Sequence, residues 1–419
     1  MTPFLPLLLL LSAASGCAAL IYEIVWYQLL QLAIGSTAVS LGVLLATFMG
    51  GLCIGSIGLP RLKKTRHPLQ TYALLELGIA VCGILVLILL PLVDRAYIAG
   101  AQHGMPGMLL RGLICAILML PPTILMGASL PAIVRWIEST PRGISWWGLL
   151  YGANTAGAVF GCLFAGFYLL RIYDTVVATI AAALINLAVA AISSRLAAKT
   201  PAASTQDPAS ENAPDPSDDR ASVWPIYVTI GLSGACALGA EVVWTRLLGM
   251  LLGATVYVFS IILAVFLIGL AIGSTAASWL LQGLKRPLPA RLALGWCQIL
   301  LTLGIAWSAY MIADSLPYWP INPLLTTNPW YTFQVDLMRC LWAILPPTIL
   351  WGASFPLALA AAANRGEEAG RVVGGIYAAN TFGSIAGALI VSLALIPWIG
   401  TQQSQRLLLV LSGASALFV

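Results

Sequence analysis

Charge is what this sequence has least of. Of its 419 residues only 8% are charged, whereas 60% are hydrophobic, and the mean hydropathy is +0.94. A water-soluble domain carries about 25% charged residues, so this chain has too few to cover a surface that faces water. Intrinsic disorder is excluded by the same numbers, because it requires few apolar residues and a high net charge. The composition therefore predicts an integral membrane protein.

Histidine and paired cysteines are also scarce. The two histidines, His67 and His103, fall in expected loops, and the eight cysteines lie in apolar runs without a CxxC pair. We interpret the cysteines as small buried residues, because a thiol in hydrocarbon has no base to ionise it. No metal site or cofactor is expected. The net charge of +5 predicts no nucleic-acid partner, because basic residues of membrane proteins gather on one side for topological reasons.

Twelve apolar segments are long enough to cross a bilayer. A helix needs ~20 residues to span a hydrocarbon core of ~30 Å. The expected fold is an all-α integral membrane protein with about 12 transmembrane helices, and its surroundings are the lipid bilayer. The expected spans are 5–33, 37–59, 69–92, 109–136, 146–170, 176–196, 225–252, 256–281, 288–313, 338–362, 372–396 and 405–419.

The basic residues predict the orientation of these spans. With a cytoplasmic N-terminus, fourteen of the 20 Lys and Arg residues lie on the inner side. That distribution fits the positive-inside bias of membrane proteins. We expect a multi-pass protein of a bacterial cytoplasmic (inner) membrane with both termini in the cytoplasm.

Two polar stretches lie between the spans. Residues 200–222 consist of Pro, Ala, Ser, Asp, Glu and Asn and cannot bury enough apolar area to order themselves, so they predict a disordered cytoplasmic linker. The outer segment Asp314 to Asp336 contains Trp319, Trp330 and four prolines but no lysine or arginine. We expect it to lie at the headgroup level or over the outer mouth, and a protein partner would bind there.

Three sequence blocks occur twice, in the same order, on the two sides of the linker. The paired blocks agree at ten of 21, nine of 11 and six of 11 positions. Chance does not produce three such matches in one order. The pairs are SGCAALIYEIVWYQLLQLAIG (15–35) with SGACALGAEVVWTRLLGMLLG (233–253), PPTILMGASLP (121–131) with PPTILWGASFP (346–356), and YGANTAGAVFG (151–161) with YAANTFGSIAG (377–387).

These matches predict an internal duplication. The first six-helix repeat covers 1–199 and the second covers 223–419, which we expect to be truncated at its C-terminal end. Because each repeat has an even number of helices, both copies enter the membrane from the same side. Two parallel repeats of this kind are typical of major-facilitator transporters.

Each repeat carries one glutamate in its first helix, Glu23 and Glu241. A charged side chain that faces lipid costs ~2.5 to 3.5 kcal/mol on insertion scales, so both should face protein or water and have a partner. One interpretation is a pair of counter-ions for a cationic substrate, or a proton relay. The other is structural: pairing with Arg246, whose counterpart in the first repeat is Gln28, or hydrogen bonds at helix breaks.

A third intramembrane glutamate, Glu76, is matched by the neutral Gln298. Because the charge is lost in one copy, a hydrogen bond between helices is favoured over an obligatory ion site.

Small and amphipathic residues supply further candidates. The spacing GxxxG permits close helix packing, which we expect at Gly51/Gly55, Gly157/Gly161, Gly269/Gly273 and Gly383/Gly387. Asn154 and Asn380 either bond neighbouring helices or face a ligand. Aromatic rings can flank an alkylammonium ion by cation–π contact, and the candidates are Trp26, Trp244, Tyr151 and Tyr377.

Two proline pairs, Pro121/Pro122 and Pro346/Pro347, are expected to break their helices. The carbonyl groups freed by proline must then find Thr123, Thr348, water or a ligand. Broken helices at matching places in two repeats indicate the binding region of a transporter.

The duplicated blocks around Glu23 and Glu241, with the doubled PPTIL-x-GAS-x-P and Tyr-x-Ala-Asn-Thr-x-Gly, resemble the membrane region of the bacterial spermidine-synthase-like membrane proteins. Those proteins are described as fused major-facilitator/spermidine synthases. The resemblance implies a multi-helix inner-membrane domain followed by a cytoplasmic aminopropyltransferase-like domain that uses decarboxylated S-adenosylmethionine.

The sequence departs from that family pattern at the enzyme. It stops at Val419 and has no Gly-rich loop after a strand and no catalytic aspartate motif, so a catalytic domain would have to follow it. The first hypothesis is a transporter-like membrane domain that binds or moves a small cationic solute such as a polyamine. The alternative is a membrane anchor or assembly subunit for a soluble aminopropyltransferase-like domain or a partner complex.

Overall fold

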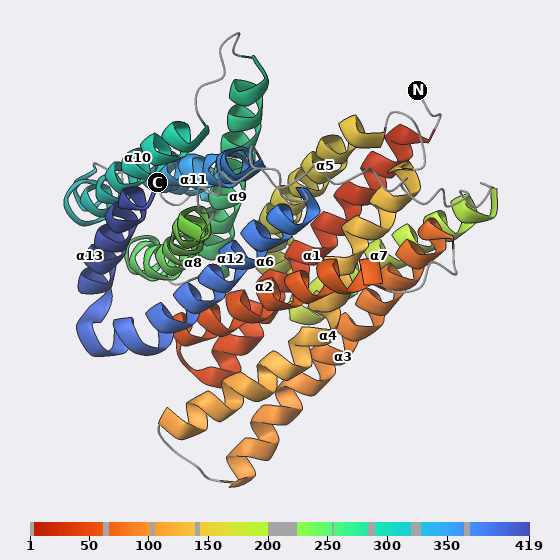
Figure 1. Cartoon of the computed structure of the whole chain (residues 1–419). Helices are drawn as coiled ribbons and strands as arrows, with labels where there is room; N and C mark the ends of the chain where they lie inside the picture. The colour runs from red at the N-terminus through yellow and green to blue at the C-terminus, as the bar shows by residue number, and fades with distance from the viewer. Residues whose placement is uncertain are drawn as a thin grey trace. The chain divides into compact units, whose positions relative to one another are not determined.

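The structure is a computed structural model, and all of the secondary structure that it describes is helical. The chain forms two compact units, Met1–Glu211 and Asn212–Val419. Figure 1 draws the first from red to yellow-green and the second from green to blue. The described residues are 4–61, 67–100, 105–138, 143–199, 224–253, 255–283, 290–319, 328–363 and 369–419.

The first unit contains six membrane-spanning segments. The fifth is composite, because a π-helical turn and a short helix continue α5 without interruption. The elements are α1 (Leu5–Ile34), α2 (Thr37–Arg61), α3 (Pro68–Gly100), α4 (Met105–Glu138), α5 (Gly143–Phe164), η1 (Ala165–Leu169), α6 (Leu170–Ile172) and α7 (Thr175–Lys199).

The second unit repeats this order. A π-helical turn and a 3-10 turn follow its third span, and a second π-helical turn lies in its fifth. The elements are α8 (Trp224–Leu252), α9 (Val256–Gly283), α10 (Ala290–Tyr310), η2 (Met311–Ser315), η3 (Leu316–Tyr318), α11 (Pro329–Ala363), α12 (Ala369–Ile390), η4 (Val391–Leu395) and α13 (Ile396–Leu417).

Eleven described segments are long and apolar enough to cross a membrane, and the last of them, Gly374–Leu417, has 44 residues. That is twice the length that one crossing needs. Gly400, with φ 80° and ψ 168°, interrupts the helix inside this segment. The break divides the segment into two spans, so the sequence-based expectation of about twelve helices is confirmed.

The predicted spans have the correct type but not always the correct ends. The tenth predicted span corresponds to α11, which begins at Pro329 rather than at Met338. Asp336 therefore belongs to a helix and not to the outer polar segment. Residues 320–327 of that segment lie outside the described residues, as do the predicted linker residues 200–222.

Both units pack their helices in the same way. In the first unit the extensive contacts join α1 with α5, α2 with α4, α3 with α4, α3 with α7 and α1 with α7. The corresponding helices of the second unit make the corresponding contacts: α8 with α12, α9 with α11, α10 with α11, α10 with α13 and α8 with α13. The duplication seen in the sequence is therefore a duplication of tertiary structure.

The first helix of each unit ends at an equivalent glycine. Gly35 follows α1 with φ 79°, and its N–H donates to the Gln31 carbonyl at 3.0 Å. Gly253 follows α8 with φ 107°. A left-handed backbone favours glycine because it has no Cβ, which explains why both matched blocks finish on this residue.

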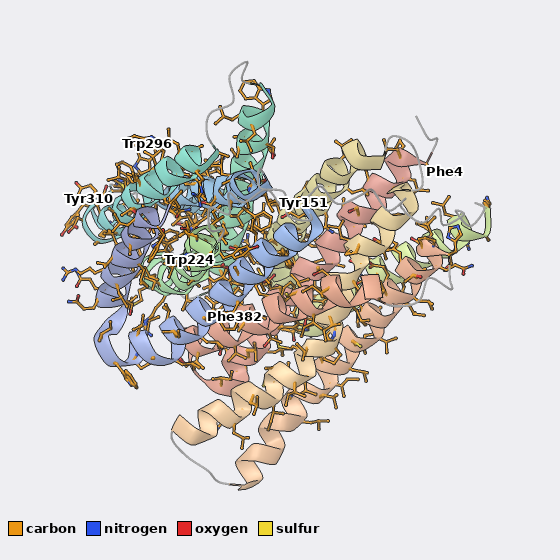
Figure 2. The ribbon with its side chains drawn as sticks, in the orientation of Figure 1. Phe4, Tyr151, Trp224, Trp296, Tyr310 and Phe382 are labelled. Carbon is orange, nitrogen blue, oxygen red and sulfur yellow. The ribbon has the colours of Figure 1, made fainter. Side chains whose placement is uncertain are left out.

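Large apolar side chains cover the outside of the described helices, as expected for helices surrounded by lipid. On α10, Trp296 and Tyr310 are 57% and 56% exposed, and Figure 2 shows both rings at the surface of that helix. The polar residues of the spans lie inside instead. On α3 the exposed large apolar residues are Leu74, Leu77, Val81, Ile84, Leu85, Ile88, Leu89 and Leu92.

Candidate functional site

Glycines fix the distance between the first and fifth spans of each unit. A Cβ added to Gly157 would overlap the backbone of Ala13, and one added to Gly161 would overlap that of Cys17. In the second unit Gly383 and Gly387 meet Gly231 and Ala235 in the same way, and the glycines of the other two pairs meet Thr123, Ile124, Thr348 and Ile349. The prediction of close helix packing at all four GxxxG spacings is confirmed.

These contacts set the level of each candidate glutamate. Four residues along α1, from Ala13 to Cys17, correspond to four residues along α5, so the two helices run in the same direction. Together with the contact of Gly16 with Asn154, this register puts Glu23 between the end of α5 and the middle of η1. In the second unit Gly239 lies against the side chain of Val391, which begins η4, and this puts Glu241 level with the middle of that turn.

The π-helical turns η1 and η4 occupy equivalent positions in the two repeats. Each begins the same number of residues after its Tyr-x-Ala-Asn-Thr block, and each is closed by an N–H to carbonyl bond over five residues, Leu170 to Ala165 and Ile396 to Val391. Such turns are rare and frequently lie at functional sites. Pro397 follows η4 in the second repeat, but the first repeat has no proline after η1, so no feature shared by the two repeats predicts these turns.

Glu23 is buried without a neutralising group. Its side chain is 5% exposed, and it has no hydrogen-bond or ion-pair partner among the residues that the structure describes. Glu241 is 2% exposed at the equivalent position of α8. The two glutamates therefore share the burial and the level in the helix that their sequence positions predict.

The tryptophan one turn after each glutamate packs inside its own unit. Trp26 is fully buried and stacks on Tyr22 with ring centroids 5.5 Å apart, and Phe48 of α2 lies 6.4 Å away. Trp244 is equally buried, 5.5 Å from the Trp351 ring of α11. Each tryptophan therefore packs against aromatic rings of its own unit, one turn along the helix from the glutamate.

Arg246 does not neutralise either acid within the described structure. Its side chain is exposed, and it forms no ion pair among the described residues. Because five residues separate it from Glu241, the two side chains lie on different faces of α8. The alternative in which Arg246 pairs with Glu241 is therefore not seen.

The Tyr-x-Ala/Gly-Asn-Thr block contributes mainly contacts between helices. The Asn154 side chain donates to the Ser12 carbonyl at 3.1 Å and so connects α5 to α1. Tyr151 is 57% exposed and projects from α5 in Figure 2. In the second unit Asn380 lies against Gly234, and the Tyr377 ring meets Phe355 edge-on at 6.4 Å.

The expected helix breaks at the proline pairs are wrong. Both α4 and α11 continue through their prolines. The hydroxyl groups of Thr123 and Thr348 donate to carbonyls of the preceding turn at 2.8 to 3.1 Å. In the second unit α10 supplies two more donors to the carbonyls that proline frees: Trp307 to Trp342 at 2.9 Å and Ser308 to Ala343 at 2.7 Å. Neighbouring helices thus keep a proline-containing helix intact.

One pair of charged residues was missed by the sequence-based reasoning. Asp336 and Arg339 lie one turn apart near the start of α11, 3.9 Å from each other, with side chains 8% and 7% exposed. The sequence predicts Asp336 in the outer segment and Arg339 at the outer end of the span 338–362. A proline is favoured at the first position of a helix, so Pro329 was the signal that would have put the pair inside α11.

The fold is that of membrane transporters. A bacterial homologue of the iron transporter ferroportin in an inward-facing state superposes with a TM-score of 0.61 at 11% identity, over 99% of this chain and 99% of that chain. A bacterial metal transporter gives a TM-score of 0.58 at 14% identity, over 100% and 98% of the two chains.

A bacterial homologue of the human lysosomal transporter Spinster, inward-facing and unoccupied, gives a TM-score of 0.57 at 12% identity, over 100% and 96%. No family model matches the sequence, and no match was found among curated proteins. The chain is therefore a multi-pass membrane protein with a major-facilitator-like fold of two six-helix repeats.

Proposed function

We propose that this protein binds or moves a small organic cation of the polyamine class, with Glu23 and Glu241 as counter-ions. The observation that carries the proposal is the carboxylate of Glu23, buried in a membrane span with no neutralising group among the described residues. Such a charge is expensive in a bilayer and is retained where it has a use.

The presence of a buried glutamate at the same position in both repeats supports a binding site. Each repeat puts a glutamate at the same level of its first helix, beside a π-helical turn of the neighbouring parallel helix. Irregular helices at matching places in two repeats are typical of transporter binding regions. The fold shared with transporters is the second support.

The chemistry of the site favours an ammonium ion over a metal ion. One carboxylate at each site can accept several N–H donors from an alkylammonium group, whereas metal ions require several ligands in a fixed geometry. A polyamine carries two or more such groups, and the carboxylate in either repeat can hold one of them.

Calorimetric titration of the purified protein with spermidine and putrescine tests the proposal. We expect saturable binding to the wild type, weakened at least about tenfold by Glu23→Gln and by Glu241→Gln, since tenfold corresponds to about 1.4 kcal/mol. The matched control is Glu76→Gln, the same chemical change in the same repeat, which should leave the affinity unchanged. Absence of binding, or equal binding by all four proteins, would overturn the proposal.

The alternative proposal is a membrane anchor or assembly subunit, as the resemblance to spermidine-synthase-like proteins implies. The observation in its favour is that Tyr318 and Trp330 of the outer segment 314–336 are 81% and 65% exposed. It predicts co-purification of a partner that protects this segment, together with no polyamine binding. The placement in a bacterial inner membrane, with cytoplasmic termini, is part of both proposals.

A further inference from the structure

A fully buried acid lies in the middle of the first unit, away from the candidate cation site. Glu76 of α3 is 0% exposed. The Ser15 hydroxyl of α1 donates to its Oε1 at 2.6 Å, and the Asn186 amide of α7 donates to its Oε2 at 2.5 Å. These bonds join three helices, and the prediction that Glu76 makes hydrogen bonds between helices is confirmed.

The groups around Glu76 are neutral. Its titratable neighbours are Tyr72 on α3 and Tyr22 on α1, while α7 presents the amide of Asn186. Among the described residues no ion pair to Glu76 is seen, and its hydrogen-bond donors are a hydroxyl and an amide. A carboxylate in such surroundings would carry an uncompensated charge in an apolar interior.

The amide of Asn186 has an acceptor that is not used. Asn186 is 1% exposed, and its Oδ1 atom has no hydrogen-bond partner among the described residues. Half a turn about the last side-chain bond exchanges the amide oxygen with the nitrogen. A proton on Glu76 Oε2 would then be donated to Asn186 Oδ1, which removes the buried charge and gives the amide oxygen a partner, while the amide nitrogen takes the place that has no described partner.

The second repeat keeps a buried, hydrogen-bonded side chain at this place but loses the acid, and its bonds go to α11 and α13, the counterparts of α4 and α7. Gln298 is 0% exposed, donates to the Ser354 hydroxyl at 3.1 Å and accepts from the Ser415 hydroxyl at 3.1 Å. Leu294 and Ser412 stand where the first repeat has Tyr72 and Asn186. A neutral amide therefore fills the equivalent place, and the form of Glu76 that resembles it most closely is the protonated acid.

We propose that Glu76 is a proton-binding site confined to the first repeat. The carboxylate takes up one proton from water to become a carboxylic acid, and the amide of Asn186 rotates to accept the new O–H. The Asn186 N–H bond to Oε2 is exchanged for this O–H bond to Oδ1, and no other covalent bond forms or breaks. The site links α1, α3 and α7, so release of the proton would leave a charge at their junction. It does not depend on the proposed polyamine site, which involves other residues.

Infrared difference spectroscopy of the full chain in lipid bilayers, across a pH series, tests this proposal. The wild type should show the carbonyl stretch of a buried carboxylic acid. Glu76→Gln should remove that band and retain the fold, because Gln298 already fits the equivalent place. Asn186→Leu should keep the band and move it to higher frequency, because the acid loses its acceptor.

The controls are Glu23→Gln and Glu241→Gln, which remove the other two buried glutamates and should leave the band unchanged. A band that survives Glu76→Gln would overturn the proposal, as would a wild type without any carboxylic-acid band. If Glu76→Gln fails to fold, Asn186→Leu decides the matter, and an unshifted band in that variant would contradict the inference.

Discussion

Asp336→Asn should lower the free energy of unfolding by about 3 to 5 kcal/mol, because it leaves the buried guanidinium of Arg339 without its counter-charge. Arg339→Met should cost less, since a carboxyl can take up a proton whereas a guanidinium cannot lose one. The double variant Asp336→Leu with Arg339→Met should recover most of the loss, because apolar residues can replace a buried pair. Reversible denaturation in mixed micelles measures all three.

Two exposed charges provide the controls for this experiment. Asp314→Asn and Arg406→Met make the same kinds of change at exposed positions and should stay within about 0.5 kcal/mol of the wild type. A value for Asp336→Asn in that same range, or a double variant as unstable as Asp336→Asn alone, would show that the pair is not the buried unit described above.

Gly157→Ala should destabilise the first unit by about 1 to 3 kcal/mol or more, because the added methyl group would overlap the Ala13 backbone. The helices α1 and α5 would have to separate, and the level of Glu23 relative to η1 would change with them. We therefore expect this substitution to reduce polyamine binding as well as stability.

The matched control lies in the same sequence block. A Cβ at Gly152 would meet nothing within 4 Å, and the second repeat has Ala378 at this position. Gly152→Ala should therefore be neutral or slightly stabilising, because alanine favours a helix more than glycine does. Equal stability of the two alanine variants would contradict the close approach of α1 and α5.

Much of the fold could be predicted because the bilayer restricts the alternatives. Backbone groups in hydrocarbon must be satisfied internally, so each long apolar run is a helix, and the three repeated blocks divide the helices into two copies. The proline pairs misled the prediction because the donors that compensate them, Trp307 and Ser308, come from a different helix. No local pattern shows which neighbour will supply a donor.

The candidate site was predictable only in part. Glu23 and Glu241 are conspicuous because charges are rare in the spans. Their position beside η1 and η4 could not be predicted, because a π-helical turn has no composition of its own and follows from packing. The ion pair of Asp336 with Arg339 was not predicted because the predicted span begins at Met338, nine residues after Pro329, which leaves Asp336 outside the helix and Arg339 at its end.

Uptake of labelled spermidine into proteoliposomes tests directly whether the protein moves a polyamine with Glu23 and Glu241 as counter-ions. We predict saturable uptake by the wild type and loss of at least about 90% of that uptake in Glu23→Gln and in Glu241→Gln. Uptake by Gly152→Ala should equal that of the wild type. That loss corresponds to about tenfold in rate, or about 1.4 kcal/mol. Wild-type uptake no greater than that of protein-free liposomes, or uptake unaffected by either glutamate substitution, would contradict it.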